Sequence, residues 1–465
     1  MTRQAIPLGD VLTGRLPAHT LPWSVEIATD RASVDAYAAL RRATFVAEQG
    51  LFDGSDRDDV DDDPRTVVLV ARSTAGAVLG GVRLAPAHEP DIGWWQGSRL
   101  VVDVRARRVH GIGAALVRAA CAHAERLGAL RFEACVQAVN ADFFTSLGWQ
   151  RVGDREFAGR PHVQMRWPVE RFAGQVRETK AVLGGLLDGL HLGGDGFVGD
   201  DGAPVPGSDL VAACDAIVPA LVEREPEWAG WCGVLVNVND LAAMGAQPVG
   251  LLDALAARDA SFASRVMTGL RAAAAAWGVP VLGGHTQLGT PAALSVTALG
   301  RAVHPVPAGG GRPGQTVTLT ADLGGGWRHG HTGRQWDSTT TRTADELRAL
   351  TRVVADTAPA AAKDVSMAGL VGTLGMLAES SGCGAVLDVA DVPTPAAATR
   401  ADWFGCFPGW AMITTDRPDR PVRRPGFVHS RSCGELVADG GVSLRWPDGA
   451  VTPAVGADVT GLGVA

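Results

Sequence analysis

Aspartates recur in short polar motifs through the second half of the chain, and their chemistry suits a metal-bound nucleotide. The segment Asn239–Pro248, NDLAAMGAQP, places an amide and a carboxylate side by side, one helical turn before a Gly-Ala-x-Pro stop. An acidic pair precedes this segment, and a glycine-flanked histidine, Gly284-His285, follows it. Mg²⁺ prefers a few hard oxygen ligands together with substrate phosphates. We therefore expect a magnesium–nucleotide site, and because the chain has no GxxxxGK[ST] motif, the phosphates must be held without a Walker loop.

The candidate metal and nucleotide contacts occur in order along this half of the chain. The predicted magnesium ligands are Asp200, Asp201, Asp215, Asp240 and Asp364. The predicted nucleotide contacts are Lys180, Asn239 and Gly284, and the predicted catalytic residue is His285. Any one such aspartate is as readily explained as a helix cap or turn residue, and a lone histidine as a core residue. Several of these motifs in one ordered series favour a functional site.

This series resembles the superfamily of aminoimidazole ribonucleotide (AIR) synthetase, thiamine monophosphate kinase and selenophosphate synthetase over roughly residues 181–465. The GDDGA segment at 199–203 is similar to the metal-binding GDDAA of the thiamine monophosphate kinases. Residues 215–248 and the GGHT at 283–286 most resemble selenophosphate synthetase. The resemblance implies a two-part PurM-like fold. Its first α+β half would pair across a homodimer to form a β-barrel, and its second half would be α+β.

The resemblance also implies ATP and Mg²⁺ as cofactors. One of the acidic pair at 200–201, together with Asp240 and Asp364, would hold magnesium ions that bridge the ATP phosphates. The Gly-rich segment 184–194 would close over the nucleotide. Selenophosphate synthetases present a cysteine or selenocysteine shortly before a lysine, whereas Lys180 follows Val-Arg-Glu-Thr in this chain. We therefore do not expect selenide chemistry, and Lys180 is either a phosphate contact or a solvated linker residue.

The first third of the chain carries a different signal, a glycine-containing turn between a strand and a long amphipathic helix. Arg108–Gly113 reads RVHGIG. Glycines there let successive backbone N–H groups turn toward one point, at the positive end of the helix dipole, which makes an anion site. A dinucleotide fingerprint would need a third glycine where Leu116 stands. The turn therefore predicts a diphosphate site that does not match the dinucleotide fingerprint.

Together with NADFFTSLGW at 140–149 and FVAEQ at 45–49, this turn resembles the GNAT acyltransferase family over about residues 25–168. The resemblance implies a GNAT fold that binds acetyl-CoA or another acyl-CoA and transfers the acyl group to an amine, which must be deprotonated to attack. It implies cofactor contacts along the turn and its flanks and at one asparagine. These predicted contacts are Val102, Val104, Arg108, Val109, His110, Gly111, Ile112, Gly113, Ala114 and Asn140.

One position departs from the GNAT pattern. Many members have a tyrosine where Phe144 stands, and that tyrosine protonates the leaving thiolate; the only tyrosine here is Tyr37. General acid–base help is worth about 10²–10⁴-fold, so its absence slows transfer without excluding it. The predicted catalytic bases are Glu133 and Asp103, and strand parity does not decide between them. The acidic run 53–63 either holds a cationic acceptor amine or, as its composition favours, is a solvated loop.

Length and composition set the broad class of protein. The chain has 465 residues, of which 46% are hydrophobic and 20% charged, with a net charge of −8. Two or three globular domains are expected at this length. No Lys/Arg cluster is interleaved with aromatics, so nucleic acid is not an expected partner. We find neither a signal-peptide core nor a membrane-spanning run, and the scattered cysteines suit a reducing cytoplasm.

Hydrophobic periodicity predicts α/β organisation in the first part of the chain, and the resemblance implies α+β organisation afterwards. The predicted domains are residues 1–172, 181–305 and 306–465. Predicted helices include 33–49, 114–127, 261–277, 343–357 and 367–380. Predicted strands include 66–72, 80–85, 99–104, 130–136, 279–282, 293–299 and 316–320.

The leading functional hypothesis is a bifunctional cytoplasmic enzyme, in which an acetyl-CoA-dependent N-acyltransferase is fused to a Mg²⁺·ATP-dependent AIR-synthetase-like enzyme. The architecture also resembles a bacterial pairing linked by its family naming to nitrogen starvation, which implies a small nitrogen-containing metabolite as substrate. An alternative makes the GNAT half an acyl-CoA sensor that regulates the ATP-using half. A third hypothesis, a non-catalytic dimerisation scaffold, is disfavoured because a scaffold does not need to gather like charges.

Overall fold

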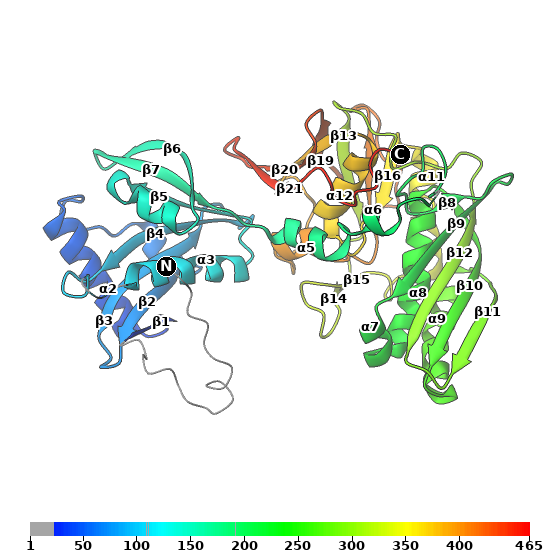
Figure 1. Ribbon diagram of the computed structural model, residues 1–465, viewed down its shortest axis with the longest axis horizontal. Helices are drawn as coiled ribbons and strands as arrows, with labels where there is room; N and C mark the ends of the chain where they lie inside the picture. Colours follow the sequence, from blue (N-terminus) through cyan, green and yellow to red (C-terminus); the bar gives the residue numbers. More distant parts are fainter. Residues whose placement is uncertain (1–22, 108, 110, 191) are drawn as a thin grey trace. The chain divides into compact units, whose positions relative to one another are not determined.

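A seven-stranded sheet organises the first of two structural units, Met1–Val169 (Figure 1). The computed structural model describes residues 23–107, 109, 111–190 and 192–465. The strand order is β1-β2-β3-β4-β5-β7-β6, and every neighbouring pair is antiparallel except β4 with β5. The strands are β1 (Trp23–Ile27), β2 (Val67–Ser73), β3 (Val78–Pro86), β4 (Trp94–Val102), β5 (Arg131–Gln137), β6 (Gln150–Phe157) and β7 (Arg160–Trp167).

Helices cover both faces of this sheet because its strands alternate two apolar surfaces. On β2, Leu69 and Ala71 belong to the core beneath helix α3 (Ile112–Arg126), whereas Val70 belongs to the core with Tyr37 of α2 (Arg31–Arg41). This is the period of two expected of a strand buried on both sides. The remaining helical segments of this unit are η1 (Arg42–Glu48), η2 (Asp59–Asp61), η3 (Ala138–Asn140) and α4 (Ala141–Ser146).

The parallel strands β4 and β5 separate partway along their length. They pair only from Trp94↔Arg131 to Gly97↔Ala134. Beyond that point the register between β3 and β4 shifts, and Arg99 adopts a φ of 55°. Such a bulge bends a strand and ends its pairing on one side. Beyond Gly97 and Ala134 the two strands no longer pair with each other, so a gap opens between them.

The second unit, Glu170–Ala465, contains two larger sheets and a two-stranded ribbon. The five-stranded sheet has the order β11-β10-β12-β9-β8, with β10 and β11 parallel. Its strands are β8 (Ala203–Pro204), β9 (Leu210–Ile217), β10 (Gln247–Ala257), β11 (Val281–Leu288) and β12 (Ala293–Arg301). The seven-stranded sheet comprises β13 (Thr316–Ala321), β16 (Ala361–Asp364), β17 (Gly384–Asp388), β18 (Ala411–Asp416), β19 (His429–Val437), β20 (Gly441–Arg445) and β21 (Val451–Val455). The two-stranded ribbon consists of β14 (Gly326–Trp327) and β15 (Trp336–Asp337).

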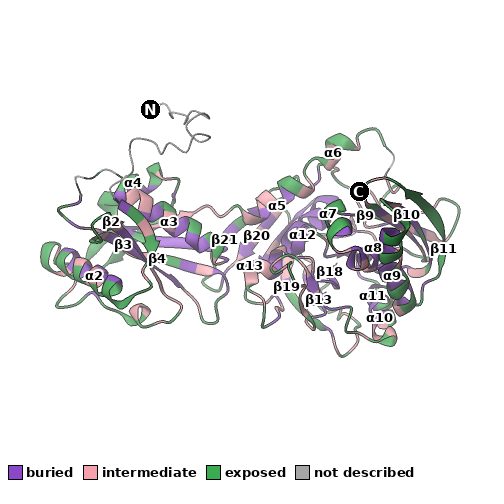
Figure 2. Cartoon of the chain, turned by 90° about the horizontal axis from the view of Figure 1, so that it is seen from below, coloured by how far each residue is buried: buried purple, intermediate pink, exposed green. Residues whose placement is uncertain are grey.

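Two central helices, α8 (Pro226–Ala243) and α12 (Gly369–Ser380), are buried along almost their whole length (Figure 2). A helix that is apolar all round is expected to be enclosed by other elements. Helix α8 lies against α9 (Ala260–Trp277) through glycines: a Cβ at Gly269 would lie 1.7 Å from the Glu227 carbonyl oxygen, and one at Gly230 would lie 2.1 Å from that of Val266. The other helices are α5 (Arg171–Thr179), α6 (Leu183–Leu186), α7 (Pro219–Arg224), α10 (Ala344–Leu350), α11 (Val353–Thr357) and α13 (Arg400–Gly405).

Several sequence expectations change in the structure. The helix expected over 343–357 is two helices, α10 and α11, separated at Thr351–Arg352. The strand expected at 99–104 begins earlier, at Trp94, because the bulge at Arg99 interrupts its apolar alternation. The five-stranded sheet is open among the described residues of the single chain, and the barrel expected across a homodimer stays a prediction. Within the same described ranges, no helix combines the length and apolar character needed to cross a lipid bilayer.

Candidate functional site

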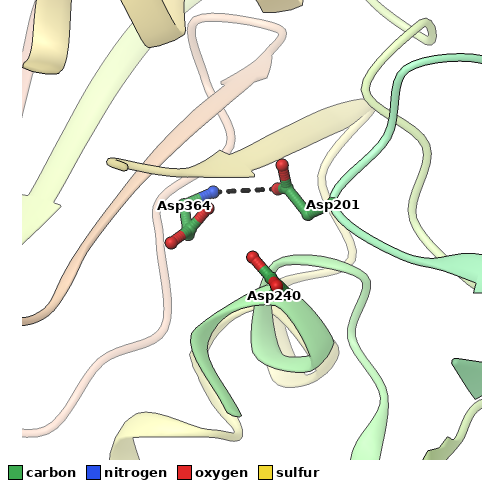
Figure 3. Close-up of side chains that lie close together, drawn as sticks. All are labelled: Asp201, Asp240 and Asp364. Atoms are coloured by element: carbon green, nitrogen blue, oxygen red, sulfur yellow. Dashed lines mark hydrogen bonds between the residues drawn. The ribbon is translucent and has the colours of Figure 1, made fainter. Parts of the chain in front are cut away.

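Three aspartates from distant parts of the chain converge in the second unit (Figure 3). Asp201 lies in the turn before β8, Asp240 near the end of α8, and Asp364 at the end of β16. Each offers a carboxylate oxygen within 4.8 Å of the others. The backbone N–H of Asp364 donates a 3.1 Å hydrogen bond to Oδ2 of Asp201, which joins the β16 terminus to the acidic turn. The sequence series thus becomes one cluster of hard oxygen ligands.

Lys363 supplies a buried positive charge beside this cluster. Its side chain is 2% exposed, and Nζ lies 2.6 Å from Oδ1 of Asp201 and donates a 3.1 Å hydrogen bond to the Gly199 carbonyl. Burial opposes the charged form, but Asp201 and Asp200 outweigh it and raise the pKa of Lys363 above its usual value. The ammonium therefore fixes the acidic turn against β16.

The cluster carries more negative charge than this lysine offsets. Burial, and then the neighbouring carboxylate of Asp364, raises the pKa of Asp240 well above the usual range. Burial, and then Asp201, raises the pKa of Asp364 in the same way. Like charges gathered in a dry site cost free energy unless a cation compensates them. The donor set, all carboxylate oxygens, fits Mg²⁺.

The remaining predicted ligands lie around this cluster in different settings. Asp200 turns its Oδ1 toward the Ala308 backbone N–H at 2.9 Å, while its Oδ2 is buried without a hydrogen-bond partner among the described residues. Burial raises the pKa of Asp200 to about 7. Asp215 lies on β9, and its charge raises the pKa of Asp364. Lys180, just after α5, acts on the same carboxyl group in the opposite sense. Both residues are thus within electrostatic reach of the cluster.

Three predicted residues are not brought into the cluster within the single chain. Asn239 is buried and its amide donates to the Gly409 carbonyl at 2.8 Å, so it fastens α8 to a loop. Gly284 lies on β11, where a Cβ would approach the Asp253 backbone oxygen to 2.5 Å, so close strand packing explains this glycine. His285 is exposed on the same edge strand. No spacing rule distinguishes such edge-strand residues from site residues.

The first unit contains a cavity of about 440 Å³ where β4 and β5 separate. Its lining includes Gly97 to Leu100 of β4 and Ala134 to Gln137 of β5, together with the predicted cofactor contact Asn140. Phe144, which stands where a tyrosine is common, also lines it and packs edge-to-face on Trp149. The cavity is therefore formed by the strand gap and closed by aromatic side chains.

The predicted diphosphate cradle lies at the start of α3. Gly111 caps this helix with a φ of 94°, a conformation that glycine adopts without strain. The first N–H groups of the helix, at Ile112, Gly113 and Ala114, have no partner within it and point along the positive end of its dipole. Of the other predicted contacts, Val102 ends β4, Val104 and Val109 are exposed, and Arg108 and His110 lie outside the described residues.

Neither predicted base reaches the cavity. Glu133 is 1% exposed and is held by Arg131 at 2.8 Å and by Arg166 at 2.7 Å. Asp103 accepts the Arg105 N–H at 2.9 Å and pairs with its guanidinium, which lowers the pKa of Asp103 and weakens it as a base. Both carboxylates therefore have structural partners. Their assignment from strand order alone missed these arginines.

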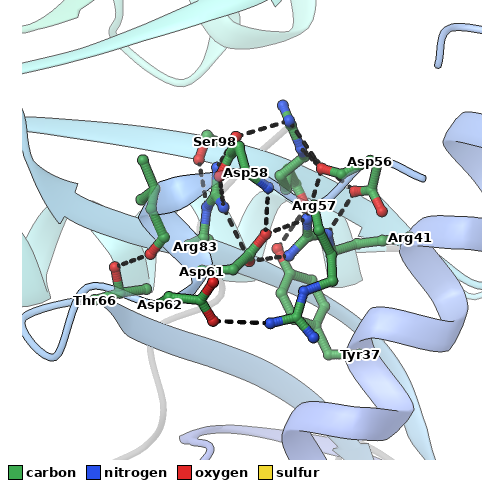
Figure 4. Close-up of polar contacts among 12 residues, drawn as sticks. Tyr37, Arg41, Asp56, Arg57, Asp58, Asp61, Asp62, Thr66, Arg83 and Ser98 are labelled. Carbon is green, nitrogen blue, oxygen red and sulfur yellow. Dashed lines mark hydrogen bonds and ion pairs between the residues drawn. The ribbon is translucent and has the colours of Figure 1, made fainter. Parts of the chain in front are cut away.

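The acidic run at 53–63 forms a partly buried ion-pair network and is not simply a solvated loop (Figure 4). Asp56 lies 2.6 Å from Nε of Arg41 and is only 4% exposed. Asp58 and Asp61 lie 2.5 and 2.9 Å from the same Nη1 atom of Arg83. The arginines come from other elements of the unit, so the run fastens its loop to the sheet.

Replacing Arg83 with methionine should lower the free energy of unfolding of the first unit by about 1–3 kcal/mol, because Asp58 and Asp61 would lose a buried charged partner although each keeps a second arginine. Calorimetric unfolding of the full chain would measure this loss. Arg31→Met is the matched control: its pair with Asp35 is 93% and 68% exposed, and exposed pairs contribute about 0–1 kcal/mol. Equal losses in the two variants would contradict a stabilising role for the network.

The fold and the two sites define a protein that joins an acyltransferase-type unit to a nucleotide-type α+β unit, and three family models match accordingly. The acetyltransferase (GNAT) family matches residues 34–149. The N-terminal domain of AIR synthase related proteins matches residues 199–302, and the C-terminal domain matches residues 312–420. The chain is therefore a fusion of a GNAT domain with an AIR synthase-related region.

Three curated relatives each match part of the chain. Uncharacterized protein sll0787 of Synechocystis sp. is 35% identical over 238 residues, 49% of this chain and 74% of that protein. The chain belongs to the family of this relative. A thiamine-monophosphate kinase of Synechococcus elongatus is 37% identical over 112 residues, 22% of this chain and 34% of the kinase. The carbamoyl dehydratase HypE of Rhodobacter capsulatus is 30% identical over 206 residues, 40% of this chain and 60% of that protein.

Proposed function

We propose that the chain is a bifunctional enzyme. Its first unit transfers an acyl group from acetyl-CoA or another acyl-CoA to an amine, and its second unit uses Mg²⁺·ATP to phosphorylate a small nitrogen-containing metabolite. The observation that carries the ATP-dependent half is the convergence of Asp201, Asp240 and Asp364 within 4.8 Å. Similarity to a thiamine-monophosphate kinase supports phosphoryl transfer as the reaction class.

The second unit has the residues that such chemistry needs. Asp201, Asp240 and Asp364 would hold Mg²⁺, which neutralises charge on a transferring phosphoryl group when bound. Lys363 fixes the acidic turn, and Lys180 adds positive charge at its edge. Phosphoryl transfer requires positioning and charge compensation more than covalent help. The residues present therefore suffice for the reaction class without a protein nucleophile.

The first unit supports acyl transfer through its cleft. The gap between β4 and β5, the cavity there and the uncapped α3 N–H groups together suit a thioester carried on a diphosphate. An acyl-CoA-sensing role is the alternative, and Phe144 is the observation that favours it, because a phenyl ring cannot protonate the leaving thiolate. Tight acetyl-CoA binding without thiol release across a broad amine panel would select the alternative.

Homodimer formation is a further part of the proposal. Strand β11 is exposed along its whole length at the edge of the five-stranded sheet. Leu252, Leu282 and Leu288 on this sheet are 40, 58 and 50% exposed, an apolar surface of the kind that a second copy covers. Pairing through this sheet would bring exposed His285 toward the partner. We propose a cytoplasmic location on the scattered free cysteines, and a role in nitrogen metabolism on the family resemblance.

The test is a product screen with the purified full chain. Incubation with ATP, Mg²⁺ and a metabolite extract should release ADP or AMP, and EDTA should stop the release. Incubation with acetyl-CoA and the same extract should release free thiol whether or not EDTA is present. Mass spectrometry of the two reactions would identify the modified metabolites. ATP turnover that persists in EDTA would contradict the proposed magnesium site.

A further inference from the structure

His162 occupies a position in the first unit that the sequence motifs did not single out. It lies on β7, directly opposite Gln137 of β5, where β5 borders the strand gap. Its side chain is largely buried, and it lines the same cavity as Gln137 and Asn140. A titratable ring thus faces the space where the thioester and its acceptor would meet.

The hydrogen bonding of His162 leaves a free base in that space. Nδ1 lies 2.9 Å from the backbone carbonyl oxygen of Arg160. A carbonyl only accepts, so Nδ1 carries the hydrogen, and in the neutral ring Nε2 has the lone pair. Nε2 makes no hydrogen bond with any residue in the described part of the chain. Phe157 packs edge-to-face on the ring, with centroids 5.5 Å apart, and so holds its orientation.

The other titratable groups lining the cavity are already engaged or protonated. Asp58 is paired with Arg83 and Arg99. Burial raises the pKa of the Cys135 thiol, which keeps it neutral. The charged residue opposite His162 on β6 is Arg155, which is not a base at neutral pH. His162 is therefore the one lining side chain, among the described residues, that presents a free nitrogen lone pair to the cavity.

The wall next to His162 is aromatic. Phe157 contacts Phe52 edge-to-face at 6.0 Å, and Phe52 contacts Phe45 in the same way at 6.5 Å. All three rings line the cavity. An acceptor whose amine approaches Nε2 would place the rest of its body on these rings. The wall therefore favours an amine attached to an apolar or aromatic body over a hydrophilic one.

We propose that His162 is the general base of acyl transfer and that the acceptor is an amine with an apolar body; this rests on the acyltransferase activity proposed above. Nε2 takes one proton from the acceptor ammonium, and the neutral nitrogen attacks the thioester carbonyl carbon. The C–N bond forms and the C–S bond breaks, so coenzyme A leaves as the thiolate. The thiolate takes the second proton from the new amide nitrogen, and His162 returns its proton to solvent. No general acid is needed at Phe144.

The test compares His162→Ala and His162→Gln with the natural chain in a thiol-release assay, using acetyl-CoA with benzylamine, hexylamine or spermidine. The substitutions should lower kcat/KM by about 10²–10⁴-fold. The acidic limb that a protonatable base gives to the pH profile of kcat/KM should be absent from the variants. Added imidazole should restore part of the activity of His162→Ala. Calorimetry should show unchanged acetyl-CoA binding, which separates a lost base from a lost fold.

His88→Gln is the matched control. Nδ1 of His88 also bonds a backbone carbonyl two residues away, that of Pro90, but His88 does not line the cavity. Its kcat/KM and pH profile should equal those of the natural chain. If the natural chain turns over and His162→Gln keeps its pH profile, the assignment of His162 as the base is wrong, and the acyltransferase proposal stands. Preference for spermidine over benzylamine would overturn the acceptor class. No thiol release from any amine by the natural chain would overturn the acyltransferase proposal and the base with it.

Discussion

Replacing Asp240 with asparagine is expected to abolish Mg²⁺-dependent ATP turnover while leaving acetyl-CoA binding unchanged. Asp240 is buried on α8 and offers one of the three oxygens that converge within 4.8 Å. Asparagine keeps its volume but removes its charge. A metal ion contributes several kcal/mol of charge stabilisation, and each 1.36 kcal/mol is tenfold in rate, so the loss should be on the order of 10³-fold or more. Steady-state ADP release and calorimetric titration with acetyl-CoA would measure the two effects.

Thermal unfolding distinguishes a lost ligand from a damaged fold. Mg²⁺ bound to the folded chain raises its stability by mass action, and Asp240→Asn should lose that rise. Without metal, the variant should melt no lower than the natural chain, because one of several repelling carboxylates has been removed. Asp345→Asn, at a side chain 92% exposed, is the control and should keep both activity and the magnesium effect. Simultaneous loss of acetyl-CoA binding in Asp240→Asn would contradict separate sites.

The metal cluster was predictable because its ligands lie in motifs. Asp201, Asp240 and Asp364 each lie in a short polar motif. Several such motifs together resemble one superfamily, and that resemblance implies that the three side chains meet in space. The same motifs do not place Asn239 and His285 in the cluster of the single chain, since adjacency in a motif does not say which side chain faces the site. Asn239 turns to the Gly409 carbonyl, and His285 is exposed on an edge strand.

The first unit shows where pattern reasoning stops. The amphipathic helix predicted at 114–127 corresponds to α3, because its apolar period is set by the chain itself. The partners of Glu133 depend on which strand pairs with β5, and β7 supplies Arg166 only after the chain has turned back from β6. No local motif marks His162, because its neighbours are likewise set by strands distant in the sequence. Its position opposite Gln137 comes from strand pairing, which a single sequence does not determine.

Lysine is rare in this chain, and the two positions where it occurs are informative. The chain has only two lysines, Lys180 and Lys363, among its 42 basic residues. The structure puts both within electrostatic reach of the acidic cluster, and Lys363 is buried. An ammonium is a compact point charge and a guanidinium is a larger planar group, so lysine suits the buried position beside Asp201.

Replacing Lys363 with methionine should therefore lower the free energy of unfolding of the second unit by about 3–5 kcal/mol, because Asp201 would remain buried without its partner. Calorimetry of the full chain in EDTA would measure the loss without a metal to mask it. Lys180→Met is the control, and its partly exposed position predicts a change within about 0.5 kcal/mol.

A second substitution isolates the cause. Adding Asp201→Asn to Lys363→Met removes the stranded charge, so the double variant should recover most of the lost stability, even though it lacks both partners. The rise in stability caused by Mg²⁺ should be absent from the double variant, because Asp201 is one of the three proposed ligands. A double variant no more stable than Lys363→Met would mean that the lysine stabilises the unit through its aliphatic packing and the Gly199 carbonyl, and that its charge does not organise the cluster.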